Sequence, residues 1–393
     1  MAISLIGIGA YISQIQFSTF KSVKRREIIL FAISLIGIEA YISQSQCPSF
    51  KSVKRREIIL LAISLIGIEA YISQCQFSSF KNVKRRFGGA GLMIDQARTE
   101  IEITQSSHFE ILPHRDALSC QKAVAAWFDS LKVPLKNDFS IDQLKQLPLK
   151  ISINATPPRH SGFGSGTQLA LAAAFAVNSF FELPVPPPEE IAVSIGRGKR
   201  SAIGSHGFFK GGFLVDRGKL STDQLAPLDF QVDFPQNWRI VTMIPQNGSG
   251  LSGNQELDAF SKLPQTTQRE RQQMIDIVRN QVLPGLLKTD LDTFGEGIFE
   301  FGRRSGMMFS QIQKGPYYGA EAESLVNEIR GLGIRGVGQS SWGPCIFAVL
   351  KNDCEADDLI NWLELNHEAP LSINKCRADN QGVRTVQTNR AQR

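Results

Sequence analysis

Histidine and cysteine are scarce in this chain, with five and six residues among 393. The histidines, at positions 108, 114, 160, 206 and 367, form no H-x-x-x-H pair, and the cysteines form no C-x-x-C pair. Because such spacings mark most protein-bound zinc and redox centres, none is predicted here and the metal ligands stay unknown. Cysteines without a disulfide framework are typical of a cytoplasmic enzyme, which is our expectation.

Long apolar runs are also missing. Three near-identical units repeat every 30 residues within residues 1–86, and each holds an apolar stretch of roughly 12 to 16 residues, short of the roughly 20 that cross a bilayer. Glu39 and Glu69 interrupt the later units, and the first unit lacks the basic start of a secretory signal. We predict no membrane-spanning segment, with weak membrane-surface binding as the alternative. Near-identity indicates a recent tandem duplication, so residues 1–86 are expected to lie outside the folded enzyme.

The net charge of +6 belongs to these repeats. Of the 43 Lys and Arg and 37 Asp and Glu, 12 and 4 lie in residues 1–86, which leaves 31 and 33 in residues 87–393. A chain with slightly more acidic than basic residues has no electrostatic footprint for nucleic acid. We therefore predict no nucleic-acid partner for residues 87–393.

Glycine, in contrast, is concentrated at one informative place, the segment 157–168, which runs directly into the alanine-rich stretch 169–177. Glycine allows positive φ and leaves backbone N–H groups accessible, and alanine favours helix. A loop that enters a helix N-terminus attracts phosphate through free N–H groups and the helix dipole. The predicted phosphate-binding residues are Ser161, Gly162, Gly164, Ser165, Gly166 and Thr167.

The better-known phosphate and nucleophile motifs do not fit this loop. Thr167 replaces the third glycine of a dinucleotide fingerprint, and no lysine follows the glycines as in a Walker loop. Ser165 has glycines directly on both sides, unlike the serine of a nucleophile elbow. A glycine-rich turn before a core helix remains the alternative interpretation.

Two further segments carry polar residues among glycines. Residues 195–216 place the cations Arg197, Lys199 and Arg200 near His206, and such cations can bind phosphate oxygens. Residues 336–344 precede an apolar strand predicted at 345–350. The alternatives are cations that cap a helix end and a histidine that holds loop backbone together.

The three segments together resemble the β-ribofuranosylaminobenzene 5′-phosphate synthase family of the GHMP kinase superfamily. Its members carry HSGxGSGTQLALA, GRGxRSxIGxHGFxxGGFxVDxG and GQSSWGP, which match residues 160–172, 196–218 and 338–344. Weaker matches lie at 87–94 and 311–317, and the resemblance covers about residues 87–385.

The resemblance implies an α+β, two-half GHMP-kinase-like fold, with halves at 87–235 and 236–393 and an active site in the cleft between them. The implied activity joins phosphoribosyl pyrophosphate to 4-aminobenzoate or 4-hydroxybenzoate, with loss of pyrophosphate and carbon dioxide, in tetrahydromethanopterin biosynthesis. Mg²⁺ is expected to travel with the pyrophosphate, and Asp95 and Asp216 are the carboxylates considered for it. A homodimer is the default expectation for the assembly.

On this basis we assign roles as hypotheses. The catalytic residues are His206, Arg197, Lys199 and Arg200, with His206 as first choice because the glycines around it leave room for a ligand. Trp342 could stack on an aromatic ring. The substrate-binding set is His160, Gln168, Gln339, Ser340, Ser341 and Trp342.

Two other functions stay open. An ATP-dependent small-molecule kinase of the superfamily usually has a catalytic aspartate in the segment equivalent to 201–206, but this chain has no carboxylate there before Asp216. A non-catalytic relative is the third possibility. Relatives begin with a strand that carries an Arg-x-His-Phe-Gly-like motif, which is missing between Lys81 and Gly89, so the sheet is expected to lack an edge element.

Periodicity and punctuation also predict the elements of residues 87–393. The predicted strands are 100–103, 149–153, 213–215, 238–244 and 345–350, and the predicted helices are 120–131, 162–181 with its loop, 189–195, 266–283, 289–313, 320–332 and 355–365.

Overall fold

The computed structural model describes residues 85, 88–112, 114–131, 149–184, 186–198, 201–245, 266–341, 343–367 and 369–386, all within one compact unit, Phe77–Arg393. The repeats up to residue 84 and the predicted site residues Lys199, Arg200 and Trp342 lie outside the described residues. The halves at 87–235 and 236–393 therefore stay a prediction.

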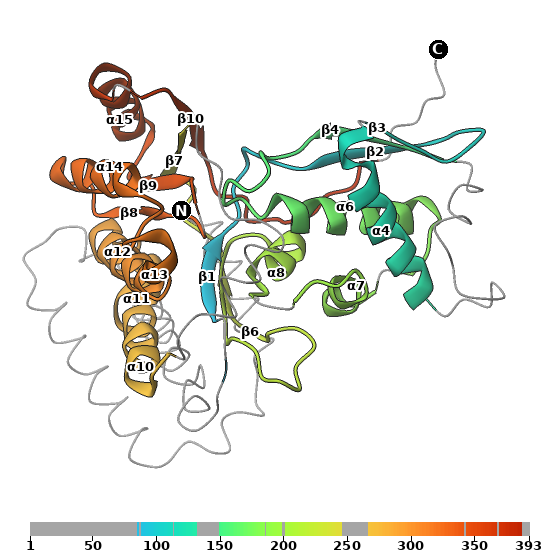
Figure 1. Cartoon of the computed structure of the whole chain (residues 1–393), viewed down its shortest axis with the longest axis horizontal. Helices are drawn as coiled ribbons and strands as arrows, with labels where there is room; N and C mark the ends of the chain where they lie inside the picture. Colours follow the sequence, from blue (N-terminus) through green and yellow to red (C-terminus); the bar gives the residue numbers. More distant parts are fainter. Residues whose placement is uncertain are drawn as a thin grey trace, which may run out of the picture. The chain divides into compact units, whose positions relative to one another are not determined.

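Helices and strands alternate irregularly along the described chain, which confirms the α+β class (Figure 1). The strands are β1 (Gly89–Leu92), β2 (Glu100–Gln105), β3 (Glu110–Leu112), β4 (Leu149–Ala155), β5 (Phe213–Asp216), β6 (Leu228–Val232), β7 (Arg239–Pro245), β8 (Gly336–Gln339), β9 (Ile346–Leu350) and β10 (Leu371–Cys376). The α-helices are α4 (His114–Ser130), α6 (Ser165–Phe180), α7 (Pro188–Ser194), α8 (Ile203–Lys210), α10 (Gln268–Ile277), α11 (Leu283–Leu287), α12 (Leu291–Met307), α13 (Ser310–Gln313), α14 (Ala320–Gly331) and α15 (Asp353–Asn366).

The strands form three sheets with the orders β1-β5-β6, β2-β4-β3 and β10-β7-β9-β8. All neighbours are antiparallel except β3 and β4. On its other edge, β1 has no strand partner among the described residues.

Alternating apolar residues explain how these sheets are covered. In β4, Leu149 and Ile151 are fully buried and pack with Leu169 and Val177 of α6, while α4 covers the same core. In the larger sheet, strand residues such as Val241 pack with α14 and α15, which lie beside that sheet in Figure 1. Each of these helices thus buries its apolar face against one sheet.

Most sequence-predicted elements are present, with two instructive differences. The single helix predicted at 266–283 is interrupted by a π-helical turn, Val278–Val282, before α11 begins with Pro284 in its first turn. The glycine-rich segment after residue 201 forms the unpredicted helix α8. Its Gly207 is needed because a Cβ there would lie 2.4 Å from the Met93 sulfur, so α8 packs closely on the segment after β1.

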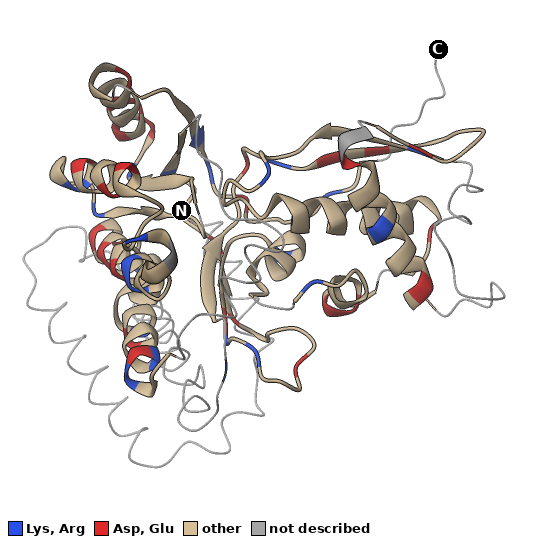
Figure 2. Ribbon diagram, viewed as in Figure 1, with Lys and Arg blue, Asp and Glu red and all other residues tan. Residues whose placement is uncertain are grey.

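The charged side chains of the described elements are mixed in sign. Figure 2 shows Lys and Arg interspersed with Asp and Glu along these helices and strands. Within the described ranges, no helix is both long enough and apolar enough to span a bilayer.

Candidate active site

The glycine-rich loop leads into α6 as the sequence predicts. Gly164 is the N-cap residue with φ of +66°, and its carbonyl accepts the N–H groups of Thr167 and Gln168 at 2.9 and 3.1 Å. The N–H groups of Ser165 and Gly166 have no hydrogen-bond partner among the described residues. The first turn of α6 therefore offers two free donors at the positive end of the helix dipole, which is the arrangement that binds phosphate.

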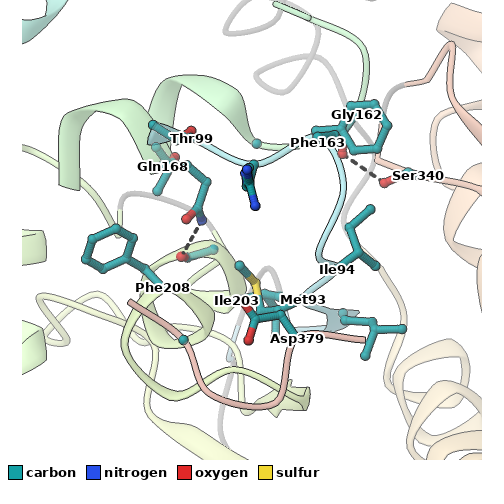
Figure 3. Close-up of a pocket in the computed structure, with 18 of the residues that line it drawn as sticks. Met93, Ile94, Thr99, Gly162, Phe163, Gln168, Ile203, Phe208, Ser340 and Asp379 are labelled. Atoms are coloured by element: carbon teal, nitrogen blue, oxygen red, sulfur yellow. Dashed lines mark hydrogen bonds between the residues drawn. The ribbon is translucent and has the colours of Figure 1, made fainter. Parts of the chain in front are cut away.

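A loop from the C-terminal part of the chain holds this glycine loop in place. The Ser340 hydroxyl donates to the Gly162 carbonyl at 2.8 Å, and the Cys345 N–H donates to the Ser161 carbonyl at 3.2 Å (Figure 3). Gly162 has φ of +98°, and a Cβ there would lie 2.5 Å from the Ser340 carbonyl oxygen. Residues 178 positions apart thus pack without space for a side chain between them.

Two side chains from the predicted set connect α6 to neighbouring segments. Arg197 donates from Nη2 to the Gly166 carbonyl at 2.8 Å, which brings its guanidinium to the first turn of α6. Gln168 donates from Nε2 to the Gly204 carbonyl at 2.9 Å, as the dashed line in Figure 3 marks. The Arg197 charge adds to the positive potential at the loop, whereas Gln168 joins α6 to the start of α8.

A cavity of about 1730 Å³ lies over this loop. The predicted residues Gly162, Gly164, Thr167, Gln168, Gln339, Ser340 and Ser341 line it. The predicted residues Ser161, Ser165, Gly166, Arg197, His160 and His206 do not line it. The cavity exceeds the roughly 300–1,000 Å³ of a common ligand pocket, so it has room for two substrates.

His206 is a buried residue of α8 and is only 1% exposed. Its Nε2 lies 2.8 Å from the Ala226 carbonyl oxygen, which can only accept, so Nε2 carries the proton. Nδ1 is buried and has no hydrogen-bond partner among the described residues. This geometry matches the alternative interpretation, a histidine that holds backbone together, and we assign it no contact with substrate.

Other predicted residues are also engaged by the protein itself. Gln339 accepts the Tyr318 N–H on Oε1 at 2.6 Å and donates from Nε2 to the Ser341 carbonyl at 3.1 Å. The Ser161 hydroxyl donates to the Pro158 carbonyl at 2.7 Å. Both side chains shape the loops through these hydrogen bonds.

Asp216 has every carboxylate lone pair directed at protein donors. Oδ1 accepts the N–H groups of Gly89 and Gly218 at 3.2 and 2.9 Å. Oδ2 accepts the Ala202 N–H and the Ser201 hydroxyl at 3.0 and 3.1 Å. Burial raises the pKa of this carboxyl, and the four hydrogen bonds oppose that rise. Asp216 fixes the start of α8 and has no oxygen left for a metal ion.

Asp95, the other carboxylate considered, does line the cavity. Its Oδ1 accepts the Arg377 N–H at 2.8 Å, and Oδ2 has no hydrogen-bond partner among the described residues. No group of three or more His, Cys, Asp or Glu side chains gathers as a metal site in the part of the chain that the structure describes. Asp95 can therefore supply one oxygen to a metal ion that a ligand brings with it.

Sequence reasoning missed two stretches of the cavity wall. Figure 3 shows Met93, Ile94 and Thr99 from the segment between β1 and β2, and Asp379 from the chain after β10. The C-terminal stretch approaches α8 so closely that a Cβ at Gly382 would lie 2.6 Å from the Phe209 backbone. Such isolated glycines were the available signal for a close backbone approach.

The start of α8 offers no carboxylate to the cavity. Ser201, Ile203 and Gly204 line it, and residues 201–206 contain no Asp or Glu. The position where a superfamily kinase is expected to hold its general base is thus occupied by small and apolar residues.

Comparison with known proteins finds one matching family domain and several similar proteins. Residues 132–209 match the GHMP kinases N terminal domain. The chain is similar to beta-ribofuranosylphenol 5′-phosphate synthase from Methanothermobacter thermautotrophicus, at 26% identity over 276 residues, 67% of this chain and 81% of that protein. It is also similar to the protein of that name from Methanocaldococcus jannaschii, at 28% identity over 279 residues, 66% of this chain and 81% of that protein.

Solved structures show the same fold at lower identity. Homoserine kinase from Cytophaga hutchinsonii aligns with a TM-score of 0.53 at 16% identity, over 75% of this chain and 90% of that one. Mevalonate kinase from L. major aligns with a TM-score of 0.54 at 18% identity, over 75% and 91%. These likenesses concern the fold alone.

Proposed function

We propose that this chain, which matches the GHMP kinases N terminal domain over residues 132–209 and is similar to beta-ribofuranosylphenol 5′-phosphate synthases, is a phosphoribosyltransferase. Its substrates are phosphoribosyl pyrophosphate and 4-aminobenzoate or 4-hydroxybenzoate. The observation that carries the proposal is a helix N-terminus, with two N–H groups that have no partner among the described residues, beside a cavity whose α8 wall lacks a kinase base. Transfer of a ribosyl group to carbon needs no such base, because no acceptor hydroxyl is deprotonated.

The proposed reaction balances without an oxidant or reductant. The ring carbon that bears the carboxylate forms a bond to the anomeric carbon of the ribose. The bond between the anomeric carbon and the pyrophosphate oxygen breaks, and its electron pair stays on pyrophosphate. Loss of carbon dioxide then returns an electron pair to the ring. A para amino or hydroxyl group supports the positive charge that develops on the ring between these two steps.

The main task of the protein in this reaction is to stabilise the negative charge on the leaving pyrophosphate. The free N–H groups of Ser165 and Gly166 and the guanidinium of Arg197 are at the loop to stabilise it. Fixed donors of this kind cost no reorganisation during the reaction. Apolar cavity residues such as Phe163 and Phe208 limit water near the cationic ribose.

We include Mg²⁺ in this proposal, because a carboxylate oxygen of the kind it prefers lines the cavity. Asp95 would hold it through the oxygen that has no partner, and the pyrophosphate would supply most other ligands. When bound, the ion supplies positive charge against the leaving group. The para-substituent of the natural acceptor, tetrahydromethanopterin biosynthesis as the pathway, a homodimer and the cytoplasm as location are further parts of this proposal.

The test measures pyrophosphate and carbon dioxide released by the full chain from phosphoribosyl pyrophosphate, Mg²⁺ and carboxyl-labelled 4-aminobenzoate or 4-hydroxybenzoate. Release of both products in equal amounts supports the proposal. Arg197→Gln should lower kcat/KM by about tenfold or more, since a hydrogen bond to a charged group contributes roughly 1.5–3 kcal/mol.

Arg269→Gln is the matched control, because Arg269 is an exposed residue in the first turn of α10. No release of either product by a cooperatively folded chain would reject the transferase proposal for these acceptors. Formation of ADP from ATP with a small alcohol would support the kinase alternative instead.

A further inference from the structure

Part of the cavity wall is aromatic and carries no charge. The face of α12 and the residues after it that line the cavity, from residue 294 to residue 316, contribute no charged side chain. Phe301 and Phe309 come from this stretch and Phe347 from β9, and all three are half-buried. A wall of this kind suits a neutral aromatic ring, which gains from edge and face contacts with other rings.

One polar side chain in this wall is held in a single orientation. Gln313, at the end of α13 beside α12 in Figure 1, is 6% exposed and lines the cavity. Its Nε2 donates to the Gly306 carbonyl at 2.9 Å. Because a carbonyl oxygen can only accept, the amide nitrogen must face Gly306 and the amide oxygen must point elsewhere.

That oxygen has no hydrogen-bond partner in the part of the chain that the structure describes. Oε1 of Gln313 accepts no hydrogen bond from any described residue, although the side chain is more than nine-tenths buried. Oε1 is absent from the fully buried polar atoms that lack a partner, so it keeps some access to the cavity that Gln313 lines and can accept a hydrogen bond there. The arrangement therefore suits a ligand group that donates a hydrogen bond.

The Gln313 segment is also joined to the glycine loop. A Cβ at Gly306 would lie 1.8 Å from the Pro316 carbonyl oxygen, so the chain after α13 packs directly on α12. Tyr318, two residues later, donates its N–H to Gln339, whose neighbour Ser340 donates to Gly162. An aromatic ligand at Gln313 would thus share the cavity with a phosphate group at α6.

We propose that Gln313 is a specificity-determining residue that recognises the amino or hydroxyl substituent of the aromatic acceptor through its amide oxygen. This inference rests on the proposed function. It gives a role to the segment 311–317, which the sequence comparison noted without a function. As the ring becomes cationic in the reaction, its amino or hydroxyl hydrogen becomes a stronger donor, so the same bond would strengthen in the transition state.

The test compares binding of 4-aminobenzoate and 4-methylbenzoate, which are similar in size but differ in the donor. Titration calorimetry with Mg²⁺ and pyrophosphate present gives both dissociation constants for the full chain. The wild type should prefer the amino compound by about tenfold, the upper range for one neutral hydrogen bond. Gln313→Leu should reduce this preference to less than about twofold.

Gln311→Leu is the matched control, because Gln311 lies exposed on the same short helix and does not line the cavity. It should keep the wild-type preference. Gln313→Lys guards against misfolding, since lysine can still donate to the Gly306 carbonyl but offers no acceptor. It should lose the preference as Gln313→Leu does.

The outcomes separate this inference from the proposed function. An equal preference in the wild type and in both Gln313 variants, or no preference in the wild type, overturns the role of Gln313 even if pyrophosphate and carbon dioxide are released. Loss of the preference in both variants supports that role even if no product forms, in which case the transferase proposal alone fails. Binding of neither compound by the folded wild type overturns both.

Discussion

At the scale of single residues, Gly162 and Gly164 show how two glycines of one loop differ in their roles. Both have positive φ, at +98° and +66°, which suits glycine better than other residues. A Cβ at Gly162 would meet the Ser340 carbonyl at 2.5 Å, whereas a Cβ at Gly164 would have no atom within 4 Å. Glycine is therefore required at position 162 by both the backbone conformation and the close packing, and at position 164 by the backbone conformation alone.

This difference predicts the effect of Gly162→Ala. The new methyl group must push Ser340 away, so the variant should lose about 1–3 kcal/mol of unfolding free energy from overpacking in addition to the conformational strain. Displacement of the loop should also weaken pyrophosphate binding. Chemical denaturation and calorimetric titration with pyrophosphate measure the two effects.

Gly164→Ala serves as the comparison for strain without a clash. It should cost about 1–2 kcal/mol, the usual penalty for a left-handed residue with a side chain. Equal stability of the two variants would show that the contact with Ser340 places no constraint on the loop.

At the scale of elements, an ion pair between Arg239 and Asp353 joins α15 to β7. Arg239 of β7 donates from Nε and Nη2 to the two carboxylate oxygens of Asp353 at 2.7 and 2.6 Å. The hydrogen bonds from Arg239, and then the nearby Lys375, lower the pKa of Asp353 from 3.8 to about 2. The Arg239 side chain is 8% exposed, so this contact lies at the edge of the core between sheet and helix.

The lowered pKa predicts a pH dependence with a definite sign. A carboxyl whose pKa is lower in the folded state contributes stability above its unfolded pKa of 3.8, and that contribution is lost as pH falls through about 2. Asp353→Asn should therefore be less stable than the wild type at pH 7, and the gap should narrow below pH 4. Urea unfolding at pH 7, 4 and 3, followed by tryptophan fluorescence, measures it.

The control is Asp358→Asn, which removes the same charge from an exposed position of α15 with no ion pair among the described residues. Its stability difference from the wild type should vary less between pH 7 and pH 3. A gap for Asp353→Asn that stays constant across this range would contradict the assignment of the ion pair.

At the scale of the whole molecule, Arg85 of the third repeat contacts residues that follow the expected boundary at residue 87. Arg85, inside the third repeat, donates from Nη1 to the Gly218 carbonyl at 3.0 Å and to Asp223 at 2.9 Å. The two side chains of this pair are 16% and 20% exposed. The compact unit itself is Phe77–Arg393. Arg85, near the end of the last repeat, therefore takes part in the fold.

This contact predicts a cost for removing Arg85. Arg85→Ala in the full chain should lower the unfolding free energy by about 1–3 kcal/mol, because a charged hydrogen-bonded pair is broken and Asp223 keeps its charge. A chain that starts at Phe87 should melt below one that starts at Phe77 for the same reason. Thermal melts followed by circular dichroism compare them.

Arg98→Ala provides the contrast, since its ion pair with Glu100 is 3.6 Å long and its side chain is 71% exposed. Such surface pairs contribute about 0–1 kcal/mol. Equal melting temperatures for the chains that start at Phe77 and Phe87 would place the boundary back at residue 87.

Much of the fold could be predicted because its signals are local. The alternation in β2 and β4 and the stripes of α14 and α15 depend on neighbours within a few residues, and so does the entry of the glycine loop into α6. The edge strand β10 was missed, because its alternating half-exposed residues lack the apolar run of the buried β7. Helix α8 was missed because its glycines allow close packing rather than a turn: Gly204 lies against Thr167 and Gln168 of α6, and Gly207 against Met93 after β1.

The features of the candidate site also differ in whether local sequence or distant contacts determine them. The sequence by itself determined that the glycine loop enters α6, since glycine spacing and helix propensity set backbone conformation without distant contacts. Only the tertiary structure decided which polar groups are free. His206 and Gln339 have backbone hydrogen-bond partners 20 and 21 residues away, while the Gln313 amide oxygen has none among the described residues. The physical reason is that a hydrogen bond is satisfied in three dimensions, and sequence spacing does not record which distant carbonyl or N–H group arrives beside it.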